Sequence, residues 1–269
     1  MKARHFIFWL HLCVGLSIGL MLLLTALTGA MLAFRPQILD QLEHDVRFLS
    51  AVPNTIKLSD KVLLKKAREL YPESEIKKVV LKKDPTATAI VNLGKQKGLV
   101  FLNPYTGELV GQETQATKTF RLVEALHRWL GMDGKLKKVG SRITGLNTLL
   151  FGLMIISGVY LWWPRKTAKL KPLKGQARYW NWHNVAGIWL SPILLTSAST
   201  GFVISYIHPK NMPWIKRLHT GELLGSVGQA LVFCGACAAI LLIVTGFTLA
   251  AYRWIRSRRP ATLMRKENN

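Results

Sequence analysis

The sequence predicts an all-α membrane protein, in which four transmembrane helices form a bundle with a pseudo-two-fold repeat. A small α+β module is inserted between the first and second of these helices. Three observations support this fold class: four long apolar runs, their arrangement as two similar pairs, and basic residues at the ends of the runs. Hydrophobic residues make up 49% of the 269 residues, which excludes a disordered chain. Because the 37 Lys and Arg residues follow membrane topology rather than a binding stripe, we expect no nucleic-acid partner.

Each apolar run has about 20 residues or more, enough to cross ~30 Å of hydrocarbon at ~1.5 Å per helical residue. The runs are residues 6–34, 143–163, 182–206 and 223–254. The start of the first run, Met1-Lys2-Ala3-Arg4 followed by apolar residues, also resembles a signal peptide. The run is much longer than the apolar core of about 7–15 residues that signal peptides have, which favours a transmembrane helix.

The loops between the runs predict the orientation of the chain. The segment 164–181 carries six Lys or Arg residues and no acid, and the tail 255–269 carries five against Glu267. The loop 207–222 carries three. The positive-inside rule therefore places both termini in the cytoplasm.

The predicted parts are a transmembrane helix in 1–34, a module in 35–118, an amphipathic and a transmembrane helix in 119–163, a basic loop in 164–181, a transmembrane helix in 182–206, an outer loop in 207–222, a transmembrane helix in 223–254 and a cytoplasmic tail in 255–269.

The segment 35–118 predicts a small helix-and-sheet module on the outer side. Residues 59–70 have helical spacing with Ser59 as a candidate N-cap, and Tyr71-Pro72 ends this helix. Residues 76–81, 87–93 and 99–102 predict short strands that are separated by turns. No combination of residues in the module suggests catalysis.

The four runs form a duplicated helical hairpin. In the first and third runs a histidine is followed four residues later by glycine and 18 residues later by the glycine of a Thr-Gly pair. A Leu-His pair precedes the second and fourth runs, each of which contains a hydroxyl residue followed by glycine. These residues are His11, Gly15 and Thr28-Gly29; His183, Gly187 and Thr200-Gly201; His127 and Ser157-Gly158; and His219 and Thr245-Gly246. Parallel repeats imply a two-fold axis along the membrane normal, so we expect His11 to face His183 and His127 to face His219.

Histidines inside an apolar helix bundle are costly unless they bind something, so they predict a functional site. Two imidazoles that face each other can supply both axial ligands of a haem, and we therefore expect two haem groups. Glycines four residues after a histidine would leave room for the porphyrin, at Gly15, Gly187 and Gly131. Two alternatives are a pathway for divalent metals and hydrogen bonding between helices. His5, His44 and His208 have no counterpart in the repeat and are interpreted as solvated, with His208 the candidate to replace His219.

Basic residues near the two membrane faces are candidates to pair with the carboxylates of a haem. They are Arg4, Arg128, Arg142, Lys216 and Arg217. The alternative is that their side chains extend to the membrane interface. The cysteines Cys13, Cys234 and Cys237 lie within apolar helices, where burial makes a thiol inert, and are interpreted as packing residues.

Three phrases resemble the PepSY-associated transmembrane helix family: Leu126-His127-Arg128-Trp129-Leu130, Ser157-Gly158-Val159-Tyr160-Leu161-Trp162-Trp163-Pro164-Arg165 and Leu218-His219-Thr220-Gly221-Glu222. The segment 101–111 is similar to the last strand of a PepSY domain. The family includes reductases of siderophore-bound iron in the bacterial inner membrane, which carry two b-type haems between four helices. The resemblance implies that His127 and His219 ligate an outer haem, that His11 and His183 ligate an inner one, and that the module lies in the periplasm.

Together these observations predict a di-haem protein that passes electrons outward across the membrane to ferric iron held by a chelator or siderophore. The cytoplasmic segments contain no G-x-G-x-x-G nucleotide motif, so a quinol or a reductase protein must be the electron donor. Two other functions remain open. One is a cytochrome b-like electron-transfer subunit with a protein acceptor, and the other is a non-redox PepSY protein with a regulatory role.

Overall fold

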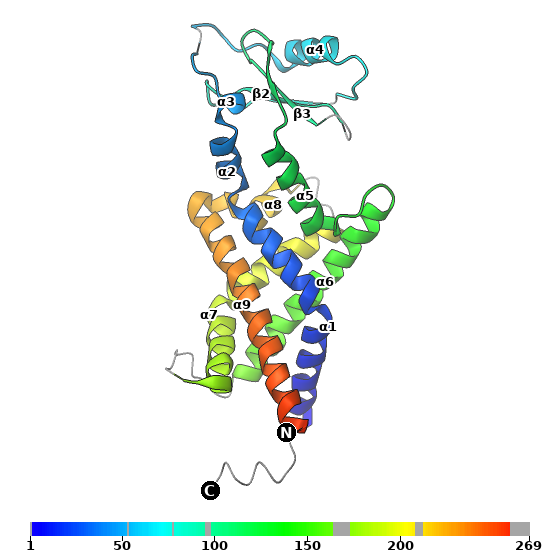
Figure 1. Cartoon of the computed structure of the whole chain (residues 1–269), viewed down its shortest axis with the longest axis vertical. Helices are drawn as coiled ribbons and strands as arrows, with labels where there is room; N and C mark the ends of the chain where they lie inside the picture. Colours follow the sequence, from blue (N-terminus) through cyan, green and yellow to red (C-terminus); the bar gives the residue numbers. More distant parts are fainter. Residues whose placement is uncertain are drawn as a thin grey trace. The chain divides into compact units, whose positions relative to one another are not determined.

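The computed structural model describes residues 2–52, 54–76, 78–94, 98–163, 173–207 and 212–258. The chain divides into two compact units, which are described separately. The helical unit comprises Met1–Ala33 and Val123–Asn269, and the inserted module comprises Phe34–Leu122. Figure 1 shows the helices of the first unit and the small sheet of the second.

Four long helices form the helical unit and confirm the four predicted spans. They are α1 (Lys2–Ala33), α6 (Leu136–Trp162), α7 (Gly175–Tyr206) and α9 (Gly225–Arg258). All four are long and apolar enough to cross a membrane. Helix α1 packs against α6 and α9, and α7 packs against the same two helices. The protein is therefore a membrane protein with four spans, and its partner over most of this surface is the lipid bilayer.

Helices α6 and α7 begin about two turns before their apolar runs. The first turns of α6 contain Lys137, Lys138 and Arg142, and those of α7 contain Arg178. Lys and Arg are good helix formers, so a helix continues through them wherever its backbone hydrogen bonds can form. The bilayer limits the length of the apolar run but not the length of the helix, so both helices extend beyond their apolar runs.

Short helices connect the spans of the helical unit. Helix α5 (Gln115–Trp129) precedes α6, and α8 (Pro213–His219) and the 3-10 helix η1 (Glu222–Leu224) precede α9. Helix α5 ends in a left-handed turn, with φ of 56° at Leu130 and 72° at Gly131. The N–H of Gly131 donates to the carbonyl of Ala125 at 3.0 Å and completes the helix end.

The inserted module contains one antiparallel sheet of four strands in the order β1-β2-β3-β4. The strands are β1 (Val79–Val80), β2 (Ala89–Asn92), β3 (Leu99–Leu102) and β4 (Leu109–Gln112). The predicted helix forms as α4 (Asp60–Leu70), and Ser59 caps it by accepting from the N–H of Val62. Leu63 and Ala67 of α4 pack in one core with the apolar residues of β2 and β3. The helices α2 (Arg35–Leu42) and α3 (His44–Arg47) were not predicted.

A buried ion pair joins α3 to the start of α5 within the module. Arg47 Nε donates to Glu43 Oε2 at 2.6 Å, and the backbone N–H of Thr117 donates to Glu43 Oε1 at 3.1 Å. Burial alone would raise the pKa of Glu43, but hydrogen bonds from Thr114, Thr117 and Arg47 and the charge of Arg47 outweigh it and lower the pKa. The ionised carboxylate therefore stabilises the folded module.

We expect Glu43→Gln to destabilise the module by about 3 kcal/mol, because Arg47 would lose its buried counter-charge and keep only the partly exposed Asp40 at 3.4 Å. The contribution of Glu43 is present above its unfolded pKa and is lost as the pH falls through its lowered folded pKa. Hydrogen exchange of the β2 and β3 amides in the whole protein measures the effect. Glu69→Gln is the control, since its ion pair with Lys65 is exposed and should contribute less than about 0.5 kcal/mol. Equal exchange rates in both variants would contradict the prediction.

Candidate functional site

The helical unit brings the four histidines of the repeat together as two facing pairs. The ring centres of His11 and His183, the first pair, lie 6.4 Å apart. Those of His127 and His219, the second pair, lie 6.3 Å apart. The ring planes make angles of 86° in the first pair and 43° in the second.

A hydroxyl group of a neighbouring helix holds each ring of the first pair. His11 of α1 contacts Ser157 of α6, with 2.8 Å between Nδ1 and Oγ. His183 of α7 contacts Thr245 of α9, with 2.9 Å between Nδ1 and Oγ1. Both contacts join a helix that carries a histidine to the other helix of the same repeat.

The second pair is held in the same way by the other two helices. His127 of α5 contacts Thr28 of α1, with 3.1 Å between Nδ1 and Oγ1. His219 of α8 contacts Thr200 of α7, with 2.9 Å between Nδ1 and Oγ1. Helix α1 therefore carries one histidine and holds another, and α7 does the same in the second repeat.

These contacts fix which ring nitrogen carries the proton. Each hydroxyl donates its own hydrogen to a carbonyl of its helix, as Thr200 does to Thr196 and Thr245 to Leu241, both at 2.7 Å. The hydroxyl oxygen is then an acceptor, so Nδ1 is the protonated nitrogen. For His127 the carbonyl of Thr25, which can only accept, also lies 2.9 Å from Nδ1. Nε2 of each ring keeps its lone pair, which is the form that binds a metal.

Burial favours the neutral form of both rings of the second pair. Burial lowers the pKa of His127. Burial together with the proximity of His127 lowers the pKa of His219 to about 4. Neither imidazole has to lose a proton before it can act as a ligand at neutral pH.

A glycine lies directly beside each histidine ring. A β-carbon at Gly29 or Gly201 would come within 3.2 Å of Cε1 of His127 or His219. A β-carbon at Gly158 would lie 3.4 Å from Cε1 of His11, and one at Gly246 would lie 3.6 Å from that of His183. The hydroxyl residue orients the ring and the following glycine gives it space, so the two residues act as one hydroxyl–glycine pair.

Two further glycines position the backbone that carries the second pair. A β-carbon on Gly140 of α6 would lie 2.2 Å from the carbonyl oxygen of Trp129, two residues after His127. A β-carbon on Gly228 of α9 would lie 2.1 Å from the carbonyl oxygen of Gly221, two residues after His219. Only glycine allows the helix and these two turns to approach so closely, and the two repeats use it in equivalent places.

A cavity of about 910 Å³ lies beside the first pair. This volume is within the range of about 300–1,000 Å³ that is typical of cofactor sites. Apolar side chains and the predicted glycines Gly15 and Gly187 form much of its wall. Three arginines also line it: Arg4, Arg253 and Arg256. A flat apolar group with carboxylates matches this combination of an apolar wall and cationic side chains.

The remaining predicted residues lie in different surroundings. Gly131 lies in the turn after α5, where its positive φ accounts for glycine, so its proposed role in making room for a porphyrin stays a prediction. Arg128 pairs with Glu124 at 2.8 Å and lies over the ring of Trp129. His5 accepts a hydrogen bond from Trp9, and His44 stacks on Phe48. His208, the predicted substitute for His219, lies outside the described residues.

The two pairs fit the axial ligand set of a haem. An imidazole nitrogen bonds a first-row metal at about 2.0 Å and lies about 1.1 Å from its ring centre, so two imidazoles across one metal have ring centres about 6.2 Å apart. Both observed separations are close to this value. Among the described residues no three His, Cys, Asp or Glu side chains gather as a metal site, and a haem iron needs only two protein ligands. Asn147 of α6 is 2% exposed, and both polar atoms of its side chain lack a hydrogen-bond partner. Such burial is costly unless another polar group bonds to these atoms.

Several residues of the site were not identified as such from the sequence. The four hydroxyl–glycine pairs were recognised as part of the repeat, but they were not matched with the histidines that they hold. Their recurrence in equivalent positions of both halves was the available signal. The tail arginine Arg256 was interpreted only as a topology signal, and Arg253, Gly140 and Gly228 carried no pattern that marked them.

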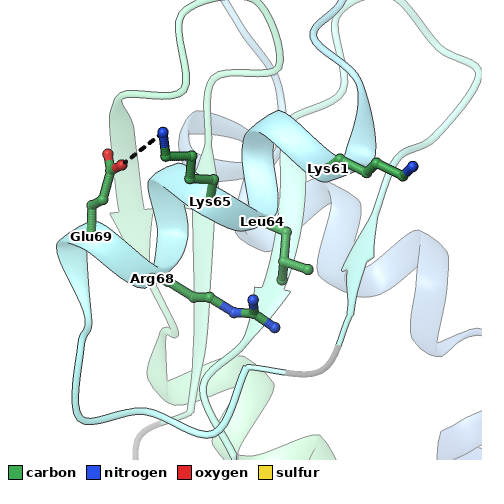
Figure 2. Close-up of a pocket in the computed structure, with 5 residues that line it drawn as sticks. All are labelled: Lys61, Leu64, Lys65, Arg68 and Glu69. Carbon is green, nitrogen blue, oxygen red and sulfur yellow. Dashed lines mark ion pairs between the residues drawn. The ribbon is translucent and has the colours of Figure 1, made fainter.

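A second hollow, of about 490 Å³, lies on the surface of the inserted module. Figure 2 shows the residues of α4 that line it, with three basic side chains around Leu64. Lys65 is 4.0 Å from Glu69 in an exposed ion pair, which leaves the balance of charge around the hollow positive. The basic residues are Lys61, Lys65 and Arg68.

These features define a class of protein: a four-span membrane protein whose helices bring together two pairs of imidazoles. Residues 8–213, more than half of the chain, match the PepSY-associated TM region, and the chain belongs to this family. The matched segment contains His11, His127 and His183 and ends before His219. No curated protein matches the chain.

We expect Gly140→Ala and Gly228→Ala each to destabilise the protein by about 2 kcal/mol, because the new methyl group must displace a backbone carbonyl. Thermal unfolding in detergent, followed by tryptophan fluorescence, measures the loss. Gly152→Ala is the control, because its β-carbon would make an ordinary contact at 3.8 Å with Ala198 and alanine favours a helix. Midpoints within 1 °C of the wild type for the first two variants would show that these close contacts do not constrain the helices.

Proposed function

We propose that the protein is a b-type di-haem electron carrier of the bacterial inner membrane that reduces chelated ferric iron, including ferric siderophores, on the periplasmic side. The observation that supports this function is the pair of imidazole sites. Each has two Nδ1-protonated rings whose centres are separated as two axial ligands of one iron would be. His11 and His183 would hold one haem, and His127 and His219 the other.

The positions of the two pairs along α1 suit electron transfer across a membrane. His11 belongs to the first pair, and Thr28, which holds His127 of the second pair, comes 17 residues later in the same helix. This interval corresponds to about 25 Å of helix, compared with a hydrocarbon thickness of about 30 Å. The two pairs would then serve opposite halves of the bilayer.

The distribution of charge supports the orientation. Basic residues dominate the segment between α6 and α7 and the tail after α9, whereas the segment between α7 and α9 has few. By the positive-inside rule the first pair lies toward the cytoplasm, and the inserted module and the second pair lie toward the periplasm.

The protein's own residues would bind, orient and shield the cofactors. A haem bound at each pair supplies the one-electron chemistry. The histidines would hold the iron through Nε2, and the hydroxyl–glycine pairs keep each ring in place. Arg4, Arg253 and Arg256 would neutralise the carboxylates at the first site. The apolar walls exclude water from the interior of the bundle.

The inserted module supports an anionic acceptor. Lys61, Lys65 and Arg68 surround the hollow on α4, and a positive surface raises the local concentration of negatively charged chelates. Hard oxygen ligands bind Fe(III) more strongly than Fe(II), so reduction releases the metal. The electron donor would be a quinol or a separate reductase protein.

The absorption spectrum of the purified protein tests the cofactor proposal. We expect a Soret band that shifts on reduction by dithionite and a content of two haems per chain. His183→Ala should lose about half of the haem and keep the second site, and His219→Ala should lose the other half. His44→Ala is the control and should keep both haems, because His44 belongs to the inserted module and stacks there on Phe48. Absence of a Soret band would favour the non-redox alternative, and loss of neither or both haems in His183→Ala would contradict the pairing.

Anaerobic mixing of the reduced protein with ferric chelates tests the acceptor. We expect the haem spectrum to reoxidise when a ferric siderophore is added, and the rate for anionic chelates to fall as salt screens the basic surface. A reduced spectrum that persists with every chelate would contradict the reductase and favour a cytochrome b-like subunit with a protein acceptor.

A further inference from the structure

Each of the four histidines receives the same contact from a different helix, although two of the histidines lie on long spans and two on short connecting helices. The pairs are Ser157-Gly158 for His11, Thr245-Gly246 for His183, Thr28-Gly29 for His127 and Thr200-Gly201 for His219. We propose that these hydroxyl–glycine pairs are positioning residues that set the redox potential of each site through Nδ1 of its histidines. This inference rests on the proposed function, because it concerns the haem that the histidines would bind.

The contact acts on the electrons of the ligand. An imidazole whose Nδ1–H donates a hydrogen bond is a stronger electron donor through Nε2. A stronger donor stabilises ferric relative to ferrous iron and lowers the reduction potential. Each hydroxyl therefore works through the ring that it holds and touches neither the iron nor the substrate.

Burial makes these hydroxyls difficult to replace. The exposed fractions of Thr245, Thr28 and Thr200 are 1%, 5% and 8%, so water has little access to Nδ1 if a hydroxyl is removed. A valine in the same place has nearly the same shape and cannot accept a hydrogen bond. The packing of the helix would then be kept while the ring loses one of its acceptors.

The same contacts hold the planes of the rings. The hydroxyl fixes the edge of the imidazole at Nδ1 and the adjacent glycine lies against Cε1, so rotation of the ring is restricted on two sides. The first pair is close to perpendicular at 86° and the second is tilted at 43°. Perpendicular axial planes bring two of the iron d orbitals close in energy, which makes the electron paramagnetic resonance of the ferric state more anisotropic. The two haems should therefore give distinguishable signals.

A redox titration of single variants tests the proposal. In Thr200→Val we expect the second site to rise in potential by up to about 59 mV, which is a tenfold change in its preference for ferric over ferrous haem. The first site should not change. In Thr245→Val the first site should rise and the second should not change. Thr200→Ser and Thr245→Ser restore the hydroxyl and should return each potential toward the wild-type value.

Thr248→Val is the matched control, because Thr248 is a partly buried threonine of α9 whose hydroxyl donates to the carbonyl of Val244 on the same helix. Potentials and resonance signals in Thr200→Val and Thr245→Val that equal those of this control, with haem content intact, would overturn the proposal and leave the proposed function standing. A wild-type protein that binds no haem would overturn the proposed function itself.

If a valine variant loses its haem, the second variants Thr200→Ala and Thr200→Ser distinguish a positioning role of the hydroxyl from a merely structural role of the side chain. Haem content that returns with serine but not with alanine supports the positioning role, and equal loss in both contradicts it.

Discussion

The structure depends on the requirement that a buried imidazole satisfies both of its nitrogens. In an apolar bundle an unpartnered polar atom costs several times the net value of a hydrogen bond. The chain supplies a partner for Nδ1 of all four histidines, from a hydroxyl of another helix. In the described part of the chain no protein group bonds Nε2 of these rings. Each ring is thus held through Nδ1 by the protein, and its Nε2 stays available for the cofactor that we propose.

The duplication connects the two sites through shared helices. Helix α1 contributes His11 to the first pair and Thr28 to the support of the second, and α7 contributes His183 and Thr200 in the same way. A shift of either helix along its axis would change both pairs together. Gly140 of α6 lets the turn after His127 lie close to α6, and Gly228 of α9 lets the turn after His219 lie close to α9. Gene duplication provides this arrangement directly, because one hairpin that holds half of each site becomes complete when a second copy faces it.

Sequence reasoning identified the four spans, the sheet of the module and the four histidines, because each leaves a strong local or periodic pattern. Uninterrupted apolar runs define the spans, and the repeated interval of 18 residues marks the histidines and the glycines. The partners of the histidines could not be assigned in this way, since the distance between His11 and Ser157 in the fold depends on how two helices cross. Gly140 and Gly228 matter because of a carbonyl in another segment, and Arg253 because of a cavity. The helices α2 and α3 were missed because both are short and depend on tertiary contacts such as that between Glu43 and Thr117.

The two repeats differ at one histidine, because the helix that carries His127 begins inside the inserted module. His127 lies near the end of α5, a helix whose first turn is bound by Glu43 inside the module. Its counterpart His219 ends α8, a helix of seven residues that starts at Pro213 and lies wholly within the helical unit. The first pair, in contrast, is carried by two long and equivalent spans. The two pairs are thus built from the same hydroxyl and glycine contacts but differ in the helices that carry their histidines. They also differ in the angle between their ring planes, which is 86° in the first pair and 43° in the second.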